Sequence, residues 1–328
     1  MIDSRMVTAD SVLATTLTGQ EQAELTILAA ELASTSPQLV DEPAWVDAAR
    51  RLSSRLPLRL RVAIREFRHD PGDDGLLLIR NLLAGEASLP PTPTAPESVE
   101  RSATKAAAMQ VLIALQIGEI VAFRDEKSGA LVQNVVPVRG REDAQSNAGS
   151  TLLEMHTENA FHANRPDFVA FFCLRSDHEN RAGLYVSSVR RAAALLPDSV
   201  KRLLAEPRFV TEPPPSFGDV GCVTMAHAVL DGDPEDPNVL VDFTSTHPLD
   251  GDARRAMTQL KNAFNEVSRT LVLRAGELAL VDNRLAIHGR TAFLPRYDGR
   301  DRWLHRTFIQ LDYRRSRAAR SGNGHVLV

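Results

Sequence analysis

From about residue 120 onward, short apolar segments alternate with Gly, Pro and Asp turns, and this rhythm limits the fold more than any other feature. Typical segments are 167–174 (DFVAFFCL), 277–283 (ELALVDN) and 302–313 (RWLHRTFIQLDY). They are short and rich in β-branched and aromatic residues, as strands are. Strands repeated at this spacing predict a β-sandwich or jelly roll.

The first third of the chain has helical spacing instead. Thr18 and Glu21 fit a capping box, in which each side chain accepts from an unpaired backbone N–H of the other residue. Residues 97–116 predict a long Ala-rich helix, and residues 189–205 and 252–270 predict two helices that interrupt the strands.

No linker or repeat divides the sequence, so we expect a single domain over residues 1–328. Its helical part, about 1–118, would pack on a β core of about 119–315, followed by a loosely held tail, 316–328. The expected class is therefore mainly β with surrounding helices.

The composition excludes several classes of protein. A net charge of -4 and a pI near 6.2 provide no basic footprint for nucleic acid. No segment is apolar for long enough to cross a membrane, and no secretory signal is evident, so a cytoplasmic protein is expected. Cys173 and Cys222 form no metal-binding spacing and are expected to be buried apolar residues.

The segment Glu154-Met-His-Thr-Glu158 is the first candidate for a metal site. In a strand, residues two apart project from the same face, so His156 and Glu158 would offer a nitrogen and an anionic oxygen to one ion. Such a pair is common by chance. His288, from a distant strand candidate, would complete a set of two histidines and one carboxylate.

This ligand set leaves open coordination positions and is typical of non-haem iron(II) oxygenases. Zinc hydrolases more often carry H-E-x-x-H on a helix or three histidines, and neither pattern is present. The plain alternative is that His288 is a hydrogen-bonded core residue.

Two arginines follow on the next strand candidate. Positions 302, 304 and 306 of one strand share a face, so Arg302 and Arg306 would point together toward the core. Buried guanidinium groups are costly unless carboxylates meet them, and a planar guanidinium binds a carboxylate through two parallel hydrogen bonds. The alternative is a basic edge strand that faces solvent.

Taken together, these motifs resemble the clavaminate-synthase-like group of iron(II)/2-oxoglutarate oxygenases, and within it the bacterial free-amino-acid β-hydroxylases. The resemblance runs from about Ala44 to Val328. The motifs that carry it are LVQNVVPV (131–138), HTENAFH (156–162), VDNRLAIHGRT (281–291) and PRYDGRDRWLHRTF (295–308).

The resemblance implies a distorted double-stranded β-helix, or jelly roll, with iron(II) bound at one open end by His156, Glu158 and His288. It assigns Arg302 to the distal carboxylate of 2-oxoglutarate and Arg306 to the carboxylate of the substrate. O2 is the third reactant, and succinate and CO2 are the co-products.

The resemblance also places several residues in the substrate pocket. Those are Arg80, Glu126, Asn147 and Asp242. Arg80 and Glu126 could instead be surface charges. The polar loop that contains Arg139, Gly140, Gln145, Ser146 and Asn147 lies just before the HxE segment, where it could cover the substrate as a lid.

One feature departs from the family. Its members usually place a Thr or Ser hydroxyl beside 2-oxoglutarate on the strand after the carboxylate ligand. Here that strand is GLYVSSV, and Tyr185, Ser187 and Ser188 all remain candidates.

The resemblance thus implies hydroxylation at Cβ of a free L-amino acid, in the synthesis of non-ribosomal peptides or other secondary metabolites. Asparagine is the first choice of substrate, because Asp242 can accept from its amide while Asn147 donates to its carbonyl. Arginine or lysine is the alternative, since Asp242 also suits a cation. A zinc-dependent hydrolase and a non-catalytic jelly-roll binding protein are the rival classes.

Overall fold

The computed structural model describes residues 12–83, 89–214, 217 and 224–328. Its α-helices are α1 Gly19–Ala33, α2 Pro43–Ser53, α3 Leu58–His69, α4 Lys105–Ile117, α5 Val189–Ala193, α6 Asp198–Leu204 and α7 Gly251–Val267. Its strands are β1 Leu13–Thr16, β2 Leu76–Arg80, β3 Glu119–Phe123, β4 Gln133–Val135, β5 Leu153–His156, β6 Phe168–Arg175, β7 Leu184–Ser188, β8 Phe209–Thr211, β9 Leu230–Asp233, β10 Asp236–Val239, β11 Thr246–Pro248, β12 Arg269–Leu271, β13 Leu278–Asp282, β14 Ala286–Arg290, β15 Trp303–Gln310 and β16 Val326–Leu327.

Two sheets form the centre of the molecule. The larger sheet has the strand order β1-β2-β13-β6-β15-β3-β16, with β4 also paired to β15, and the smaller one has the order β12-β7-β14-β5. Successive strands alternate between the two sheets, from β5 to β7 and again from β12 to β15. This alternation is the winding of a double-stranded β-helix, and it confirms the predicted fold class.

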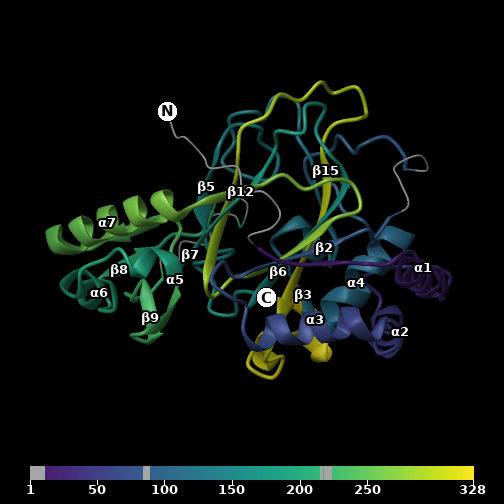
Figure 1. Cartoon of the computed structure of the whole chain (residues 1–328), viewed down its shortest axis with the longest axis horizontal. Coiled ribbons are helices and arrows are strands. Elements are labelled where there is room, and N and C mark those ends of the chain that lie inside the picture. The colour runs from purple at the N-terminus through teal and green to yellow at the C-terminus, as the bar shows by residue number, and fades with distance from the viewer. Residues whose placement is uncertain (1–11, 84–88, 215–216, 218–223) are drawn as a thin grey trace.

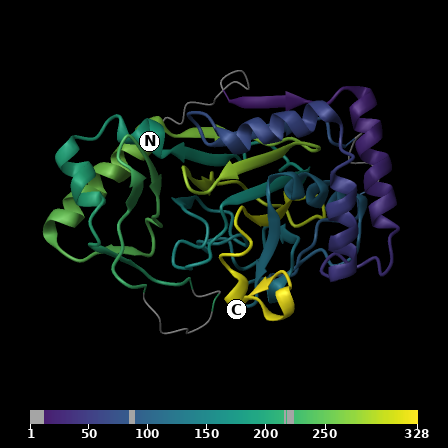
Figure 2. The same cartoon turned by 90° about the horizontal axis from the view of Figure 1, so that it is seen from below.

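Helices cover the outer faces of both sheets, so the apolar residues form three layers. Helices α1–α4 pack on the larger sheet (Figure 1), through Trp45, Phe67 and Phe168. Helices α5–α7 lie at the opposite end of the molecule (Figure 2) and pack on the smaller sheet, through Ile287 and Phe264. The third layer fills the space between the sheets.

The residues of this middle layer alternate with outward-facing ones along each strand. On β14, Ala286 points between the sheets while Ile287 packs against the helices. On β15, Leu304 and Phe308 point inward and Trp303 outward. Arg306, midway between Leu304 and Phe308, and His288, two residues beyond Ala286, therefore point into the space between the sheets.

Several local predictions agree with the structure. Thr18 and Glu21 form the capping box of α1, with the Thr18 N–H donating to the Glu21 carboxylate at 2.8 Å. The helix expected over 252–270 is α7, and the structure adds that Asp250 caps it by accepting from the backbone N–H groups of Asp252 and Ala253. Cys173 is buried in the middle layer, and Cys222 lies outside the described residues.

Other predictions are wrong. The helix expected over 97–116 begins at Lys105, because the chain before it pairs with the segment around β4: Val99 bridges Gln133. The tail is not loosely held. Strand β16 pairs in parallel with β3, and the Arg320 guanidinium is buried against the Tyr313 ring.

Among the described residues, no helix is both long and apolar enough to cross a bilayer.

Candidate metal centre

His156 and His288 come from neighbouring strands of the smaller sheet. They are direct partners in the β5–β14 pairing, and their ring centroids lie 4.9 Å apart. Since His288 shares the inward face of β14 with Ala286, both rings enter the middle layer. The Nδ1 atom of His156 lies 2.9 Å from the backbone carbonyl of Glu154, which leaves its Nε2 free to bind an ion.

Glu158 reaches the same point from irregular backbone. Strand β5 ends at His156, so the expectation that both residues lie on one strand is wrong. The Glu158 carboxylate nevertheless lies 3.3 Å from Nε2 of His288. Ligand atoms of His156, Glu158 and His288 all lie within 4.8 Å of one another. The three predicted ligands are thus brought together.

The charge states of these groups suit a divalent cation. Burial lowers the pKa of His288, so its imidazole is neutral and its lone pair is available. Burial alone would raise the pKa of Glu158, but Arg306 and the two imidazoles outweigh it and hold the pKa well below its usual range. The site therefore offers two neutral nitrogens and one anionic oxygen, without a thiolate. That donor set fits iron(II).

Arg306 occupies the centre of a buried polar cluster beside the triad. Its Nη1 donates to Glu158 Oε1 at 2.9 Å, and its Nη2 donates to the carboxylate of Glu126. Its Nε donates to Gln133 Oε1 at 3.1 Å, across the β15–β4 pairing. Burial would lower the pKa of Arg306, but the two carboxylates outweigh it and raise the pKa. The Arg306 side chain is 3% exposed, so these contacts are screened little by water.

Glu126 is the second acid of this cluster. Burial raises the pKa of its carboxyl group, which Arg306 opposes. Asn159, the residue after the Glu158 ligand, donates to Glu126 at 3.3 Å. Glu126 is therefore not the solvated surface charge that was its alternative.

Arg302 is also buried, but it has a different environment. It lies one residue before β15, and its guanidinium is 6.0 Å from the centre of the Phe293 ring. Within the described residues it forms no hydrogen bond or ion pair, and burial lowers its pKa. It is 6% exposed, which argues against a basic edge strand facing solvent. Asp177 is near enough to oppose this shift in pKa, but no carboxylate of the described residues contacts the guanidinium, and a buried cation of this kind is suited to an anionic ligand.

The predicted lid loop is attached to the strands of the triad. Gln145 donates to the Leu152 carbonyl at 2.8 Å and accepts from the Glu154 N–H at 3.2 Å. Arg290, at the end of β14, donates to the Ser146 carbonyl at 3.2 Å. The Asn147 amide oxygen accepts from both Nη atoms of Arg306 at 3.0 Å, in the amide orientation that satisfies both groups.

The earlier part of this loop contacts a different partner. The Arg139 guanidinium lies 5.0 Å from the centre of the Tyr297 ring, and Gly140, at φ 80°, donates its N–H to Glu142. The Tyr297 hydroxyl donates to the same carboxylate at 2.6 Å. These contacts fix the outer half of the loop.

Asp242 and Arg80 differ in their distance from the triad. Asp242 forms a β-bridge with His156, and its carboxylate accepts from the Thr244 N–H at 2.7 Å. Arg80 ends β2, and its Nε lies 3.5 Å from the Glu277 carboxylate. Within the described residues, Arg80 forms no hydrogen bond or ion pair with the triad, which favours its alternative as a charge at the surface.

The three candidate hydroxyls of β7 all have other partners. Tyr185 accepts from Ser268 at 2.8 Å, and Ser187 donates to the Phe264 carbonyl at 2.8 Å, both on the side of α7. Ser188 caps α5 by accepting from the Arg190 N–H. The structure singles out none of them.

Two residues of the site were not predicted. Gln133 contacts Arg306, and Asn283 contacts the backbone of Glu158. Both stand inside apolar strand candidates, LVQNVV and LALVDN, and a lone amide in such a run is a signal that could have identified them.

Comparisons with known proteins agree with this geometry. A model of the taurine catabolism dioxygenase TauD, TfdA family matches residues 101–308, which include all three ligands and both arginines. L-asparagine oxygenase of Streptomyces coelicolor is 48% identical over 309 residues, 94% of this chain and 93% of that protein. Clavaminate synthase 2 of Streptomyces clavuligerus is 35% identical over 296 residues, 88% and 90% of the two chains.

A solved structure is similar over nearly the same length. It is that of asparagine oxygenase in complex with Fe(II), (2S,3S)-3-hydroxyasparagine and succinate, with a TM-score of 0.93 and 46% identity over 96% of this chain and 98% of that one. The sequence matches, the common fold and the assembled triad lead to one conclusion. The chain belongs to the TauD, TfdA dioxygenase family, as a clavaminate-synthase-like member.

Proposed function

We propose that this protein is an iron(II)- and 2-oxoglutarate-dependent oxygenase that hydroxylates C3 of a free L-amino acid, with L-asparagine as its substrate. One observation carries the proposal: the buried Glu126–Arg306 ion pair directly contacts the carboxylate of the triad. A negative and a positive group therefore lie beside the metal site, where they can bind the two charged groups of an amino acid.

When bound, the iron with 2-oxoglutarate and O2 supplies the oxidising chemistry, in which the cosubstrate ends as succinate and CO2. His156, Glu158 and His288 would hold the ion by three donors and leave its other positions to the reactants. Arg302 would pair with the far carboxylate of 2-oxoglutarate, replacing the water that this buried guanidinium has lost.

The Glu126–Arg306 pair suits the two charges of a free amino acid. Arg306 would hold the α-carboxylate through its planar fork, and Glu126 would accept from the α-ammonium group. An amino acid esterified to a carrier or joined in a peptide lacks one of these charges. Because Arg306 also donates to Glu158, a carboxylate held there keeps the adjoining carbons near the metal, which favours hydroxylation at C3.

Asp242 and Asn147 would select the side chain. Asp242 is bridged to His156 and can accept from an amide N–H, while Asn147, in the loop that contacts Arg306, can donate to the amide carbonyl. Asparagine satisfies both groups. A longer cation, arginine or lysine, is the alternative, because Asp242 would pair with its charge.

A panel of free amino acids tests the proposal. Enzyme, iron(II), 2-oxoglutarate and air are incubated with each amino acid, and mass spectrometry detects the addition of one oxygen. We expect asparagine to be hydroxylated fastest, and we expect Asp242→Asn to lower kcat/KM for asparagine by about 10–100-fold, the loss of one charge-assisted hydrogen bond. Equal turnover of every polar amino acid would contradict the assignment.

His156→Ala is the control for the metal site. It removes one of three ligands and is expected to abolish succinate formation, whereas turnover with zinc and without 2-oxoglutarate would favour the hydrolase alternative. Membership of a dioxygenase family already argues against that alternative and against a non-catalytic binding protein.

A further inference from the structure

The carboxylate of the triad lacks the backbone support that both histidines have. His156 and His288 are paired partners in a sheet, so ladder hydrogen bonds fix their positions. Glu158 comes after the end of β5, and the next residue, Asn159, adopts a left-handed conformation at φ 52°. The pairing of β5 therefore does not hold the peptide groups around Glu158.

A side-chain amide takes the place of the missing strand. Asn283 Oδ1 accepts from the Glu158 N–H at 2.7 Å, and Asn283 Nδ2 donates to the Glu158 carbonyl at 3.1 Å and to the Pro166 carbonyl at 2.8 Å. The side chain is 1% exposed, so water does not compete for these bonds. The side-chain amide of Asn283 thus bonds to both the N–H and the carbonyl of Glu158, as a residue of a neighbouring strand would.

We propose that Asn283 is a positioning residue for the metal site: it fixes the backbone of Glu158 and thereby the place of the carboxylate ligand. The inference rests on the proposed metal site. Partners that orient a ligand are known to influence metal affinity strongly.

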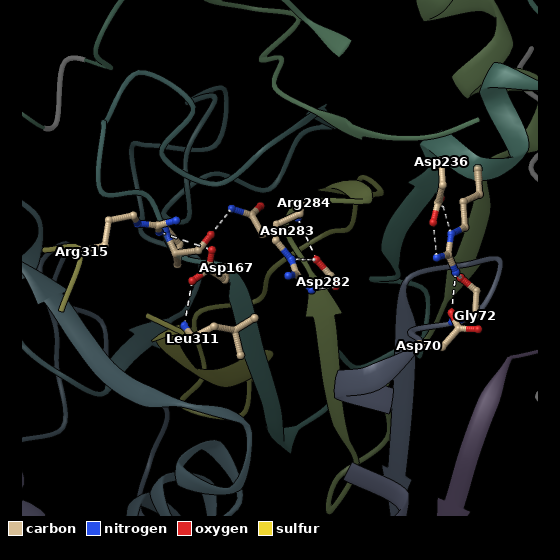
Figure 3. Close-up of polar contacts among 11 residues, drawn as sticks. Asp70, Gly72, Asp167, Asp236, Asp282, Asn283, Arg284, Leu311 and Arg315 are labelled. Carbon is tan, nitrogen blue, oxygen red and sulfur yellow. Dashed lines mark hydrogen bonds and ion pairs between the residues drawn. The ribbon is translucent and has the colours of Figure 1, made fainter. Parts of the chain in front are cut away.

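Asn283 is itself held firmly. Its N–H donates to the Asp167 carbonyl at 2.9 Å, and the Asp167 carboxylate accepts from the Leu311 N–H at 2.7 Å and lies 3.4 Å from Arg315. Figure 3 shows Asp167 between Asn283 on one side and Leu311 and Arg315 on the other. The amide that supports Glu158 is thus anchored to the ends of β6 and β15.

The neighbours of Asn283 fix the same turn, between β13 and β14. Arg284 forms an ion pair with the fully buried Asp282 (Figure 3). The Asp282 N–H donates to the Gly75 carbonyl at 2.8 Å. Strand β14, which carries His288, begins directly after this turn. The turn therefore fixes the position of His288 and, through Asn283, the position of Glu158. This connects the two remote halves of the triad.

Truncation of the amide tests the proposal. Fe²⁺ is titrated anaerobically into the metal-free protein by calorimetry, for the wild type and for Asn283→Ala. We expect the variant to bind Fe²⁺ about 10–100-fold more weakly. Gln110→Ala is the matched control, because Gln110 is a buried amide that donates to the Ala170 and His305 carbonyls from the far side of the larger sheet. It should lower the melting temperature without changing the affinity for Fe²⁺.

Asn283→Asp separates geometry from charge and serves if the alanine variant does not fold. It preserves shape and acceptor, but it sets an oxygen against the Glu158 and Pro166 carbonyls. An added negative charge alone would strengthen binding of a cation, whereas loss of the two donors should weaken it. Weaker binding supports the proposal, and affinity equal to or above that of the wild type overturns it. A wild-type protein that binds no Fe²⁺ would instead refute the metal site itself.

Discussion

Arg302 and Arg306 are two buried guanidinium groups in contrasting surroundings. Arg306 is matched by the carboxylates of Glu126 and Glu158, whereas Arg302 has no ion-pair partner within the described residues. An unpaired charge removed from water is unfavourable, so the free energy of this arrangement improves when an anion arrives. The guanidinium of Arg302 is therefore the one that gains most from binding an anionic ligand.

The replacement of Arg302 by methionine is expected to raise the KM for 2-oxoglutarate by about 10–100-fold, because one charge-assisted contact is lost. The measurement is succinate release over a range of 2-oxoglutarate concentrations. Arg320→Met, which alters a buried guanidinium in the tail, should lower the melting temperature and leave this KM unchanged. An unchanged KM in Arg302→Met would refute the assignment.

His305 gives a prediction about acid stability. It is fully buried, neither ring nitrogen has a hydrogen-bond partner in the part of the chain that the structure describes, and burial lowers its pKa from 6.5 to about 3. Between these values the unfolded chain binds a proton that the folded chain does not, so stability falls as the pH decreases from about 6.5 toward 3. The loss is on the order of a few kcal/mol.

His305→Leu should therefore unfold at a lower pH than the wild type, because leucine binds no proton in either state. Circular dichroism during an acid titration gives the midpoint. The exposed His69, changed to leucine, should leave that midpoint in place. Identical midpoints for His305→Leu and the wild type would contradict the prediction.

Which site residues could be predicted depends on how local their signal is. His156 and Glu158 are close in sequence, and Arg302 and Arg306 share one segment, so spacing reveals them. Gln133 and Asn283 act only through partners that the fold brings from far along the chain. The residues around Gln133 and Asn283 in the sequence do not indicate which partners these two amides contact.

At the scale of elements, the close approach of β5 to β14 determines the distance between the two histidine ligands. Gly289 lies between His288 and Arg290, where the register with β5 shifts. A Cβ atom at this position would lie 2.3 Å from the Leu153 carbonyl oxygen. The backbone of β5 can come this close only because residue 289 has no side chain.

Gly289→Ala should accordingly push β5 away from β14 and separate the two histidines. We expect a lower melting temperature and weaker binding of Fe²⁺ by the metal-free protein, measured by calorimetry. Gly19→Ala, where an added Cβ would meet no atom within 4 Å, is the control and should change neither quantity. Wild-type affinity in Gly289→Ala would show that the close approach is not needed.

Elements with a strong local pattern were predicted well, and those decided by distant contacts were not. Helix α7 has a cap and an apolar face, and it begins one residue before the predicted range of 252–270 and ends three residues before the end of that range. Residues before α4 have helical composition, yet the Glu100 N–H donates to the Val132 carbonyl in the loop before β4. Tertiary pairing overrides helix propensity there.

For the molecule as a whole, the alternation of strands and turns predicted a β-sandwich or jelly roll, and the family resemblance was needed to choose the jelly roll. It did not reveal the role of the tail, which lies beside β3 in the structure (Figure 1). Strand β16 is short, and its sequence, with a glycine before it, has little pattern of its own. The pairing with β3 that orders β16 is long-range, so the sequence around β16 does not predict it.

The position of Arg306 between two carboxylates has a consequence for how ligands influence one another. One guanidinium serves both the acid that would bind the metal and the acid that would bind the amino group. A ligand that accepts hydrogen bonds from Arg306 weakens the bond that Arg306 donates to Glu158, and so changes the charge that the Glu158 oxygen offers to a metal ion. Occupancy of the two places is then thermodynamically linked, and each ligand must change the affinity of the other by the same factor.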